Sequence, residues 1–335
     1  MKNLKPKELL FVQKLERHLQ EKKISEKYYH IFLSFFESFR EALAKDSTRY
    51  VDKFSVLLEL IIENIHHPYP FPLFHQKIRA PFDYYTFGKD FFLPLIDKKK
   101  SQVCGTDHIK QVESQIKKKE NVILFANHQI EGDPQAISLL FDDACPFLAD
   151  RVISVAGERV TTDPFAIPFS LGCDLLCIYS KKYIDNPPEH RHYKQMHNKK
   201  TMEMMRDLLR EGGKLIYVAP SGGRDRPDSQ GKIIPALFDP RSIEMFYLMA
   251  KRAKTPTHFY PLALSTYDLM PPPETTEIEV GEKRSIKKTP ISLALGPEIA
   301  MESFDTFKDK TEKREKRGQA IYNMMLYEYQ KIYST

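Results

Sequence analysis

Cysteine is rare in this chain of 335 residues, which contains four: Cys104, Cys145, Cys173 and Cys177. So few cysteines in so long a chain argue against a disulfide framework. Cys173 and Cys177 also lack the spacing of a zinc-binding cysteine pair. We therefore expect these two to be small apolar residues buried in the core.

Long apolar runs are also lacking. The richest stretch, Phe32–Phe36, is interrupted by Ser34 and followed by Glu37, and it falls short of the roughly 18 residues that a membrane helix needs. The first residues, Met1–Lys5, lack the apolar core of a signal peptide, and Glu8 argues against a transit peptide. The sequence thus predicts a protein without membrane spans. It would be cytoplasmic, peripheral at most to the inner membrane face, or a mature organellar chain.

The charge is moderately basic. Lysine and arginine number 51 against 45 acidic residues, which gives a formal net charge of +6. Basic clusters at Lys98–Lys100, Lys117–Lys119 and Lys251–Lys254 would attract an anionic metabolite, an acidic carrier protein or anionic lipid. The alternative for each cluster is an ordinary solvated surface. No nucleic-acid-binding motif is present, so no nucleic acid partner is expected.

Metal chemistry has little support. His190, His192 and His197 lie close together in the sequence, but no carboxylates stand beside them at ligand spacing. We expect no metal site and no cofactor.

The apolar patterns divide the chain near residue 75. Residues 1–75 show helical spacing only, with Ser25 as an N-cap and a third helix from Val51 to Ile65, before three prolines in His67–Pro72. Residues 76–335 alternate short apolar β-rich runs with helical segments, which is typical of an α/β domain. We therefore predict an α/β protein: an N-terminal helical bundle over 1–75, then a larger domain with a mixed, largely parallel sheet flanked by helices.

The predicted strands are short, and ligands of such sheets bind beyond the carboxyl ends of the strands. The strands are Asn121–Ala126, Val152–Ala156, Leu175–Tyr179, Lys214–Val218, His258–Leu264 and Ile291–Leu295, and the helices are Pro134–Phe141, Tyr193–Arg210 and Ser242–Ala253. The stretch Met270–Thr289 is predicted to leave the sheet.

A histidine and an aspartate follow the first predicted strand of the sheet. His128 and Asp133 are five positions apart. On a helix their side chains would point about 140° apart, but a turn brings them together, and Gly132 loosens that turn. A carboxylate that fixes the imidazole tautomer makes histidine a general base. No nucleophile motif lies beside His128, which favours direct attack by a substrate hydroxyl.

A structural role is the alternative for the same pair. Asp133 precedes Pro134, which favours the first position of a helix, so Asp133 would serve only as an N-cap. His128 would then be a buried histidine with its hydrogen bonds satisfied.

A second candidate segment follows the predicted strand Lys214–Val218. It consists of Ser221-Gly222-Gly223-Arg224-Asp225-Arg226. The glycines let a ligand approach the backbone. Arg224 and Arg226 project to one side of an extended segment, where both guanidiniums can bind one phosphate. The spacing is not that of a P-loop, and the alternative is a surface loop whose arginines pair with nearby carboxylates.

These segments resemble the soluble, plastid-type glycerol-3-phosphate acyltransferases of plants and some bacteria. The His-x4-Asp block is shared by many glycerolipid acyltransferases, whereas the block around Arg224 is much more specific. The matching blocks lie in order across residues 120–300: Asn127-His128-Gln129 through Asp133-Pro134, Gly157–Pro164, Pro168–Ser170, Tyr179–Lys182, Ala219–Pro227, Tyr260–Leu264, Met270–Pro273 and Gly281–Arg284.

The resemblance implies roles for these residues. His128 would be the base and Asp133 its orienting partner. Tyr183 stands where the plant enzymes usually have a histidine, and a phenol can hydrogen-bond a phosphate but normally has no positive charge. The implied phosphate ligands are Lys182, Arg224 and Arg226, with Ser221, Gly222 and Gly223 in the substrate loop.

The leading hypothesis is acylation of the sn-1 hydroxyl of glycerol 3-phosphate to give lysophosphatidate. The donor would be a fatty acyl thioester of acyl carrier protein or coenzyme A, and the product implies transient contact with a membrane surface. The plastid stroma is the alternative compartment. The alternative functions are acylation of lysophosphatidate itself and a non-catalytic lipid- or phosphate-binding protein.

Overall fold

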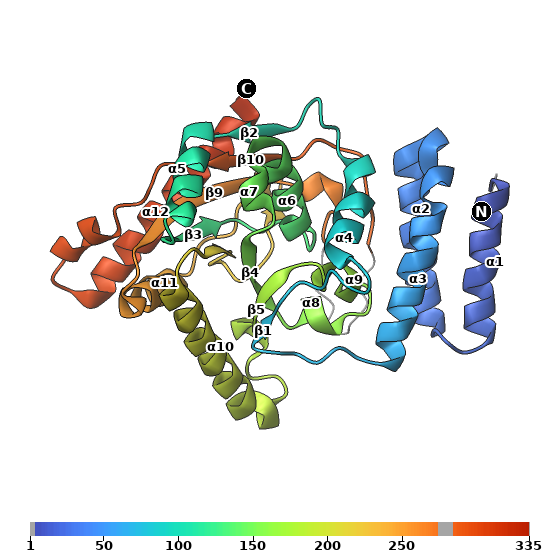
Figure 1. Ribbon diagram of the computed structural model, residues 1–335, viewed down its shortest axis with the longest axis horizontal. Helices are drawn as coiled ribbons and strands as arrows, with labels where there is room; N and C mark the ends of the chain where they lie inside the picture. The colour runs from blue at the N-terminus through green and yellow to red at the C-terminus, as the bar shows by residue number, and fades with distance from the viewer. Residues whose placement is uncertain (1–3, 274–283, 335) are drawn as a thin grey trace.

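In the computed structural model, three N-terminal helices lie beside a β-sheet that is covered by further helices (Figure 1). The structure describes residues 4–273 and 284–334. The side chain of Lys182 lies outside the described part, as do residues 281–283 of the last matching block. The middle of the predicted excursion over 270–289 also lies outside it.

The N-terminal helices are α1 (Pro6–Gln20), α2 (Glu26–Leu43) and α3 (Val51–His66). Ser25 is the N-cap of α2, and its Oγ accepts a hydrogen bond from the backbone N–H of Tyr28 at 3.3 Å. The chain leaves α3 just before the proline-rich segment, because proline cannot continue the backbone hydrogen bonds of a helix. The predicted helices and the Ser25 cap are confirmed.

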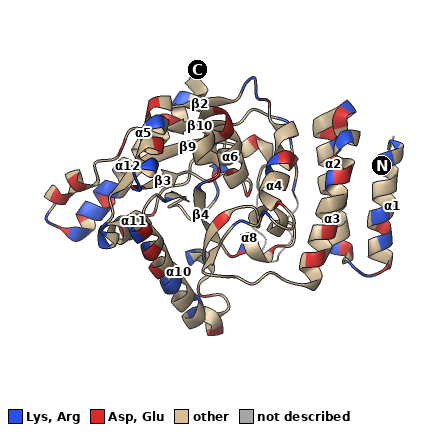
Figure 2. Ribbon diagram, viewed as in Figure 1, with Lys and Arg blue, Asp and Glu red and all other residues tan. Residues whose placement is uncertain are grey.

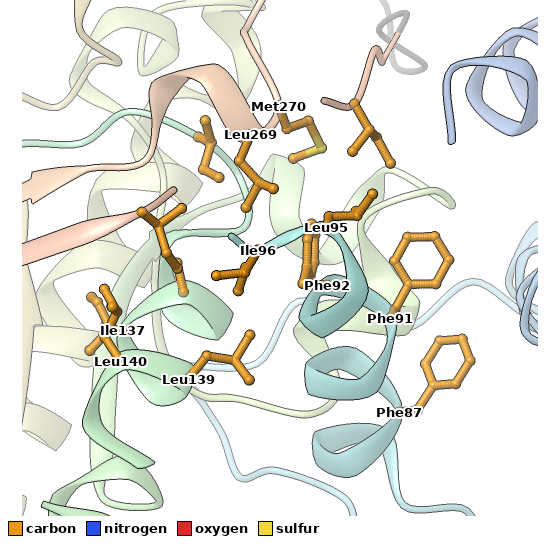
Figure 3. Packing of buried hydrophobic residues seen from close by; sticks show 14 of the residues in the cluster. Phe87, Phe91, Phe92, Leu95, Ile96, Ile137, Leu139, Leu140, Leu269 and Met270 are labelled. Carbon is orange, nitrogen blue, oxygen red and sulfur yellow. The ribbon is translucent and has the colours of Figure 1, made fainter. Parts of the chain in front are cut away.

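Aromatic rings join these helices to the rest of the molecule. The Phe54 ring of α3 lies 5.2 Å from that of Phe91 in α4 (Tyr84–Phe92), and the Phe32 ring lies 5.7 Å from that of Phe165. Figure 3 shows the α4 side of this cluster, with Phe87 one helical turn before Phe91 and Phe92. One hydrophobic core thus continues across residue 75, and the division there into two domains stays a prediction.

The main sheet has eight strands and is mixed but mostly parallel. The order is β1-β5-β4-β6-β3-β9-β10-β2, in which only the β1–β5 and β9–β10 pairs are antiparallel among the described residues. This confirms the predicted fold class. The strands are β1 (Phe74–His75), β2 (Gln102–Cys104), β3 (Asn121–Ala126), β4 (Val152–Gly157), β5 (Asp174–Ile178), β6 (Leu215–Val218), β9 (Thr257–Ser265) and β10 (Ser292–Leu295), and β7 (Arg226–Pro227) and β8 (Ile233–Ile234) form a separate ribbon.

Helices cover both faces of this sheet (Figure 1). Alternate residues of β3 enter two different hydrophobic clusters: Val122 and Leu124 pack with α5 and α6, whereas Ile123 and Phe125 pack with α10, α11 and α12. The remaining helices are α5 (Thr106–Lys117), α6 (Asp133–Ala144), α7 (Pro146–Ala149), α8 (Arg159–Thr162), α9 (Ile167–Ser170), α10 (Arg191–Glu211), α11 (Pro240–Ala253) and α12 (Lys310–Ser334).

Charge is mixed along the outer helices. Basic and acidic side chains both occur on α10, α11 and α12 (Figure 2). Among the described residues, we find no helix whose length and apolar content would suffice to cross a bilayer. Cys177 in β5 is fully buried as predicted, whereas Cys173 is only partly buried, because it lies beside an apolar cavity rather than inside the core.

Candidate active site

His128 lies where β3 ends, in the loop that leads to α6. Its Nδ1 atom is 2.8 Å from Oδ2 of Asp133, so the turn brings the two side chains together as predicted. The His128 side chain is 30% exposed, whereas that of Asp133 is fully buried. At the end of this strand, a partly exposed imidazole is therefore held by a buried carboxylate.

The Asp133 carboxylate is held from four directions. Oδ2 accepts hydrogen bonds from the backbone N–H groups of Gln129 at 2.8 Å and Ile130 at 3.3 Å as well as from His128. Oδ1 accepts a hydrogen bond from Thr266 Oγ1 at 2.6 Å. Because an ionised carboxylate only accepts, His128 donates through Nδ1 and its Nε2 is left with the free lone pair. Nε2 has no hydrogen-bond partner within residues 4–273 and 284–334.

The structural alternative for Asp133 is wrong. The N-cap of α6 is Gly132, Asp133 is the first helical residue, and its side chain binds the preceding loop rather than the helix amides. Pro134 consequently occupies the second helical position. Gly132 also differs from the prediction, because its φ of −84° suits any residue. Space is tight there instead, since a Cβ would approach the Phe92 ring to 3.0 Å and the ring would have to shift.

The arginine-containing segment follows β6, the neighbour of β3 in the sheet. Gly222 has a φ of +64°, which favours glycine, and a Cβ at Gly222 or Gly223 would meet no atom within 4 Å. The Asp225 N–H donates to the His128 carbonyl oxygen at 2.7 Å. We call residues 221–226 the arginine loop. It is thus attached directly to the backbone of His128.

The two arginines of this loop differ in their surroundings. The Arg224 Nη1 atom lies 4.0 Å from Oε1 of Glu131, inside the His-x4-Asp block. Nη1 of Arg226 is buried and has no hydrogen-bond partner among the described residues. An unpaired buried donor costs free energy unless a ligand or water satisfies it. The convergence of both guanidiniums on one phosphate stays a prediction.

A short 3-10 turn, Lys181–Tyr183, follows β5 at the same edge of the sheet. Lys181 binds Asp239 and Ser242, and the Asp239 N–H donates to Pro220 O at 3.3 Å, which links this turn to the arginine loop. The Arg159 guanidinium lies 5.7 Å from the centre of the Tyr183 ring. The predicted role of the Lys182 side chain falls outside the described residues.

An ion cluster beside the loop was missed by the sequence reasoning. Arg284 is 6% exposed, and its Nη2 lies 2.8 Å from Glu131 Oε2 and 2.9 Å from Asp163 Oδ2. Burial would lower the pKa of Arg284, but the two carboxylates raise it above the usual arginine value. Glu131 and Arg284 are 153 positions apart, so no local pattern signals their contact. The one sequence signal was the place of Arg284 in the block Gly281–Arg284, and this signal did not reveal its partners.

An apolar cavity opens beside the His-x4-Asp block. Gly132 and Pro134 form part of its wall. Figure 3 shows two of its lining residues, Phe92 from α4 and Met270 from the segment after β9. Glu131 and Arg284 make the cavity polar where it borders the ion cluster. The other apolar residues around it include Phe35, Val160, Phe165, Phe169 and Leu175.

Sequence comparison finds similar proteins for most of this chain. The family model described as "Acyltransferase" matches residues 103–265. A chloroplastic glycerol-3-phosphate acyltransferase of Cucurbita moschata is 39% identical over 301 residues, covering 88% of this chain and 65% of the relative. A second one from the same plant is 39% identical over 88% of this chain and 67% of the relative. One from Spinacia oleracea is 38% identical, with 88% and 64% covered. The chain thus spans slightly less than two thirds of the length of the first and third of these relatives, and about two thirds of the second.

Proposed function

The chain belongs to the acyltransferase family, and from this premise we propose that it is a glycerol-3-phosphate 1-O-acyltransferase. Three relatives with 38–39% identity bear the name glycerol-3-phosphate acyltransferase. The observation that best supports the proposal is the attachment of the arginine loop to His128, through the 2.7 Å hydrogen bond from Asp225 N to His128 O. This bond joins a general-base candidate to a segment suited to phosphate binding.

His128 acts as the base in this proposal. Its Nε2 takes the proton of the primary hydroxyl of glycerol 3-phosphate while that oxygen bonds to the thioester carbonyl carbon. The carbon–sulfur bond then breaks, and the imidazolium returns the proton to the thiolate. Asp133, 2.8 Å from Nδ1, fixes the tautomer and stabilises the imidazolium.

Arg224 and Arg226 bind the phosphate. The unpartnered Nη1 of Arg226 supports this role, because a phosphate oxygen would satisfy a donor that is otherwise buried without a bond. Lys182 is proposed as a third cation. Tyr183 contributes at most a neutral hydroxyl. Holding the phosphate turns the reaction of the hydroxyl with His128 into an intramolecular encounter.

The apolar cavity accommodates part of the acyl chain. Its wall includes Gly132 and Pro134, the residues on either side of Asp133, so a chain in the cavity has its thioester end near the base. Apolar walls favour burial of methylene groups by about 0.8 kcal/mol each. The acyl donor is an acyl thioester of acyl carrier protein or coenzyme A.

We further propose a water-filled compartment for the reaction, the cytoplasm or the plastid stroma. The second of these follows the word "chloroplastic" in the names of the relatives. The amphiphilic product would leave by transient contact with a membrane surface, helped by basic clusters such as Lys98–Lys100.

An assay of purified protein tests this function. Labelled glycerol 3-phosphate is incubated with acyl carrier protein thioesters and coenzyme A thioesters side by side, and labelled lysophosphatidate is measured. A parallel reaction offers lysophosphatidate as acceptor. The proposal is wrong if neither thioester yields lysophosphatidate, or if only the parallel reaction proceeds.

A further inference from the structure

A buried carboxylate stands between the two arginines without a part in the chemistry described so far. Asp225 is 0% exposed. Its Oδ2 accepts hydrogen bonds from Asn127 Nδ2 at 2.7 Å and Gln129 Nε2 at 3.1 Å, and its Oδ1 accepts one from the backbone N–H of Ala236 at 2.9 Å. All three donors are neutral amides.

No lysine, arginine or histidine forms an ion pair with this carboxylate among the described residues. Burial raises the pKa of Asp225 to about 6, although the hydrogen bonds from Asn127, Ala236 and Gln129 act in the opposite direction. An ionised group buried without a counter-charge destabilises the fold. A neutral side chain would be the simpler choice if only packing mattered.

Two of the three partners of the Asp225 side chain are the neighbours of His128 in the chain. Asn127 and Gln129 bind the Asp225 side chain, and the His128 carbonyl accepts from its backbone N–H at 2.7 Å. Asp225 of the arginine loop therefore forms hydrogen bonds with three consecutive residues of the loop that contains His128.

The same network continues to the partner of the base. Gln129 Oε1 accepts hydrogen bonds from the backbone N–H of Thr266 at 2.6 Å, and Thr266 Oγ1 donates to Asp133 at 2.6 Å. Asn127 is fixed in turn by two hydrogen bonds to the backbone of Leu264 in β9. The loops after β3, β6 and β9 are thus joined in one hydrogen-bond network that includes the buried carboxylate.

We propose that Asp225 is a positioning residue that sets where Arg224 and Arg226 stand relative to His128. The inference rests on the proposed function and deepens it. The side chain of Asp225 points into the protein, so its attachment fixes the backbone on both sides of it. The distance between the phosphate site and Nε2 of His128 is then matched to the distance between the phosphate and the reacting hydroxyl within the substrate.

Asp225→Asn is a sharp probe because it keeps the shape and removes one acceptor. Donors face both carboxylate oxygens, so the new amide N–H₂ opposes a donor in either orientation. Rotation of Asn127 offers no relief, because its amide already matches the N–H and the C=O of Leu264. The variant should loosen the contact between the loops while the surrounding strands remain paired.

The experiment measures steady-state kinetics of Asp225→Asn with glycerol 3-phosphate and the acyl donor varied separately. We expect KM for glycerol 3-phosphate to rise about tenfold or more and kcat to fall about tenfold or more, as for a displacement of roughly 1 Å. KM for the acyl donor should change less than about twofold. In an Arg226→Ala background, the effect on KM for glycerol 3-phosphate should largely disappear, because coupled residues are not additive.

Asn121→Asp is the matched control. Asn121 is 0% exposed at the amino end of β3, where it donates to Leu209 O at 2.8 Å and accepts from Lys214 N–H at 3.1 Å. It therefore ties the same two strands together at the opposite edge of the sheet. The control should lose thermal stability but keep both KM values.

Three kinetic outcomes would overturn the proposal. The first is that Asp225→Asn keeps both KM values and loses kcat only in proportion to its unfolded fraction. The second is that both KM values rise, and rise by the same factor in Asp225→Asn as in Asn121→Asp. Should Asp225→Asn fail to fold, Asp225→Glu serves instead, because it keeps the acceptors but shifts them by one methylene. It should raise KM for glycerol 3-phosphate without raising KM for the acyl donor, and the third outcome is that it does not.

Calorimetric titration of glycerol 3-phosphate into each variant separates this idea from the proposed function. Wild type that binds but does not turn over sinks the function alone, whereas equal affinity of wild type and Asp225→Asn sinks the positioning role.

Discussion

At the scale of the residue, the proposed chemistry depends on one imidazole nitrogen. Replacing His128 with alanine should lower kcat by about 100- to 10,000-fold, the usual contribution of a general base. The side chain is 30% exposed, so its loss should leave the thermal midpoint nearly unchanged. A stopped assay with circular dichroism of the same sample checks both. A variant that kept a tenth of the wild-type rate would contradict the assignment.

The arginines should affect binding rather than turnover. Arg224→Ala and Arg226→Ala should each raise KM for glycerol 3-phosphate about 10- to 100-fold, because a hydrogen bond to a charged group is worth about 1.5–3 kcal/mol. Arg224→Lys should recover part of the loss, since it keeps the charge without the planar fork. Kinetics with each substrate varied in turn decides this. An effect confined to the acyl donor would place the phosphate elsewhere.

Asp225 should give stability a distinct pH dependence. Its pKa is raised from 3.8 to about 6, so the folded state holds the proton more tightly than the unfolded state. Its charge therefore destabilises the fold increasingly as pH rises from about 4 to about 6, by a total of about 3 kcal/mol. The difference in unfolding free energy, Asp225→Asn minus wild type, should rise by that amount over this window.

Urea denaturation of both proteins at several pH values measures this difference. The titratable groups facing Asp225 are His128 in the loop after β3, Tyr217 on β6, and Tyr322 and Tyr329 on α12. They are present in both proteins, so their contributions largely cancel. A difference that stays flat between pH 4 and 6.5 would show that Asp225 is not stabilised in its protonated form.

Sequence reasoning at this scale found groups that lie close together in the chain. His128 and Asp133 share one loop, and the arginines share another, so spacing alone suggested their pairing. The contacts that fix those loops join distant segments, such as Asp225 with Asn127 and Arg284 with Glu131. Polar partners separated by 98 and 153 positions leave no periodic pattern in the sequence.

At the scale of the element, the aromatic contact between α3 and α4 joins the N-terminal helices to the part of the chain that contains the sheet. The Phe54 ring is fully buried and lies within about 6 Å of rings from α1, α2 and α4. Phe54→Ala should therefore destabilise the protein by about 3–5 kcal/mol, through lost burial and a remaining cavity. Urea unfolding measures this, with Phe54→Leu as a milder control. A loss below about 1 kcal/mol would mean that the helices collapse around the gap.

Elements with a clear apolar pattern were predicted well. The predicted strand Asn121–Ala126 has the bounds of β3, and the predicted helix Ser242–Ala253 lies within α11. Elements with mixed composition were not predicted. α12 begins with a run of charged residues, and its buried Ile321, Met325 and Tyr329 come only after that run. β1 and β2 are two and three residues long, so tertiary pairing rather than local pattern defines them.

At the scale of the whole molecule, charge should govern contact with membranes. With a net charge of +6, the protein should bind weakly to vesicles that contain anionic lipid and be released by about 1 M salt, where the Debye length falls to about 3 Å. Vesicle flotation at low and high salt measures this, with neutral vesicles as control. Retention after the high-salt wash would contradict a peripheral contact.

The pairing of distant segments also has a consequence during synthesis. Gln129 donates to the hydroxyl of Tyr329, 200 positions further on, and β2 pairs with β10, 190 positions further on. At about 5–20 residues per second, a ribosome needs about 10–40 s to pass from the first of these partners to the second. Throughout that interval His128 exists in a nascent chain whose sheet still has an open edge, which is a site for aggregation and for chaperone binding. We therefore expect the hydrogen-bond network around His128 to be complete only after α12 has docked and Tyr329 has met Gln129.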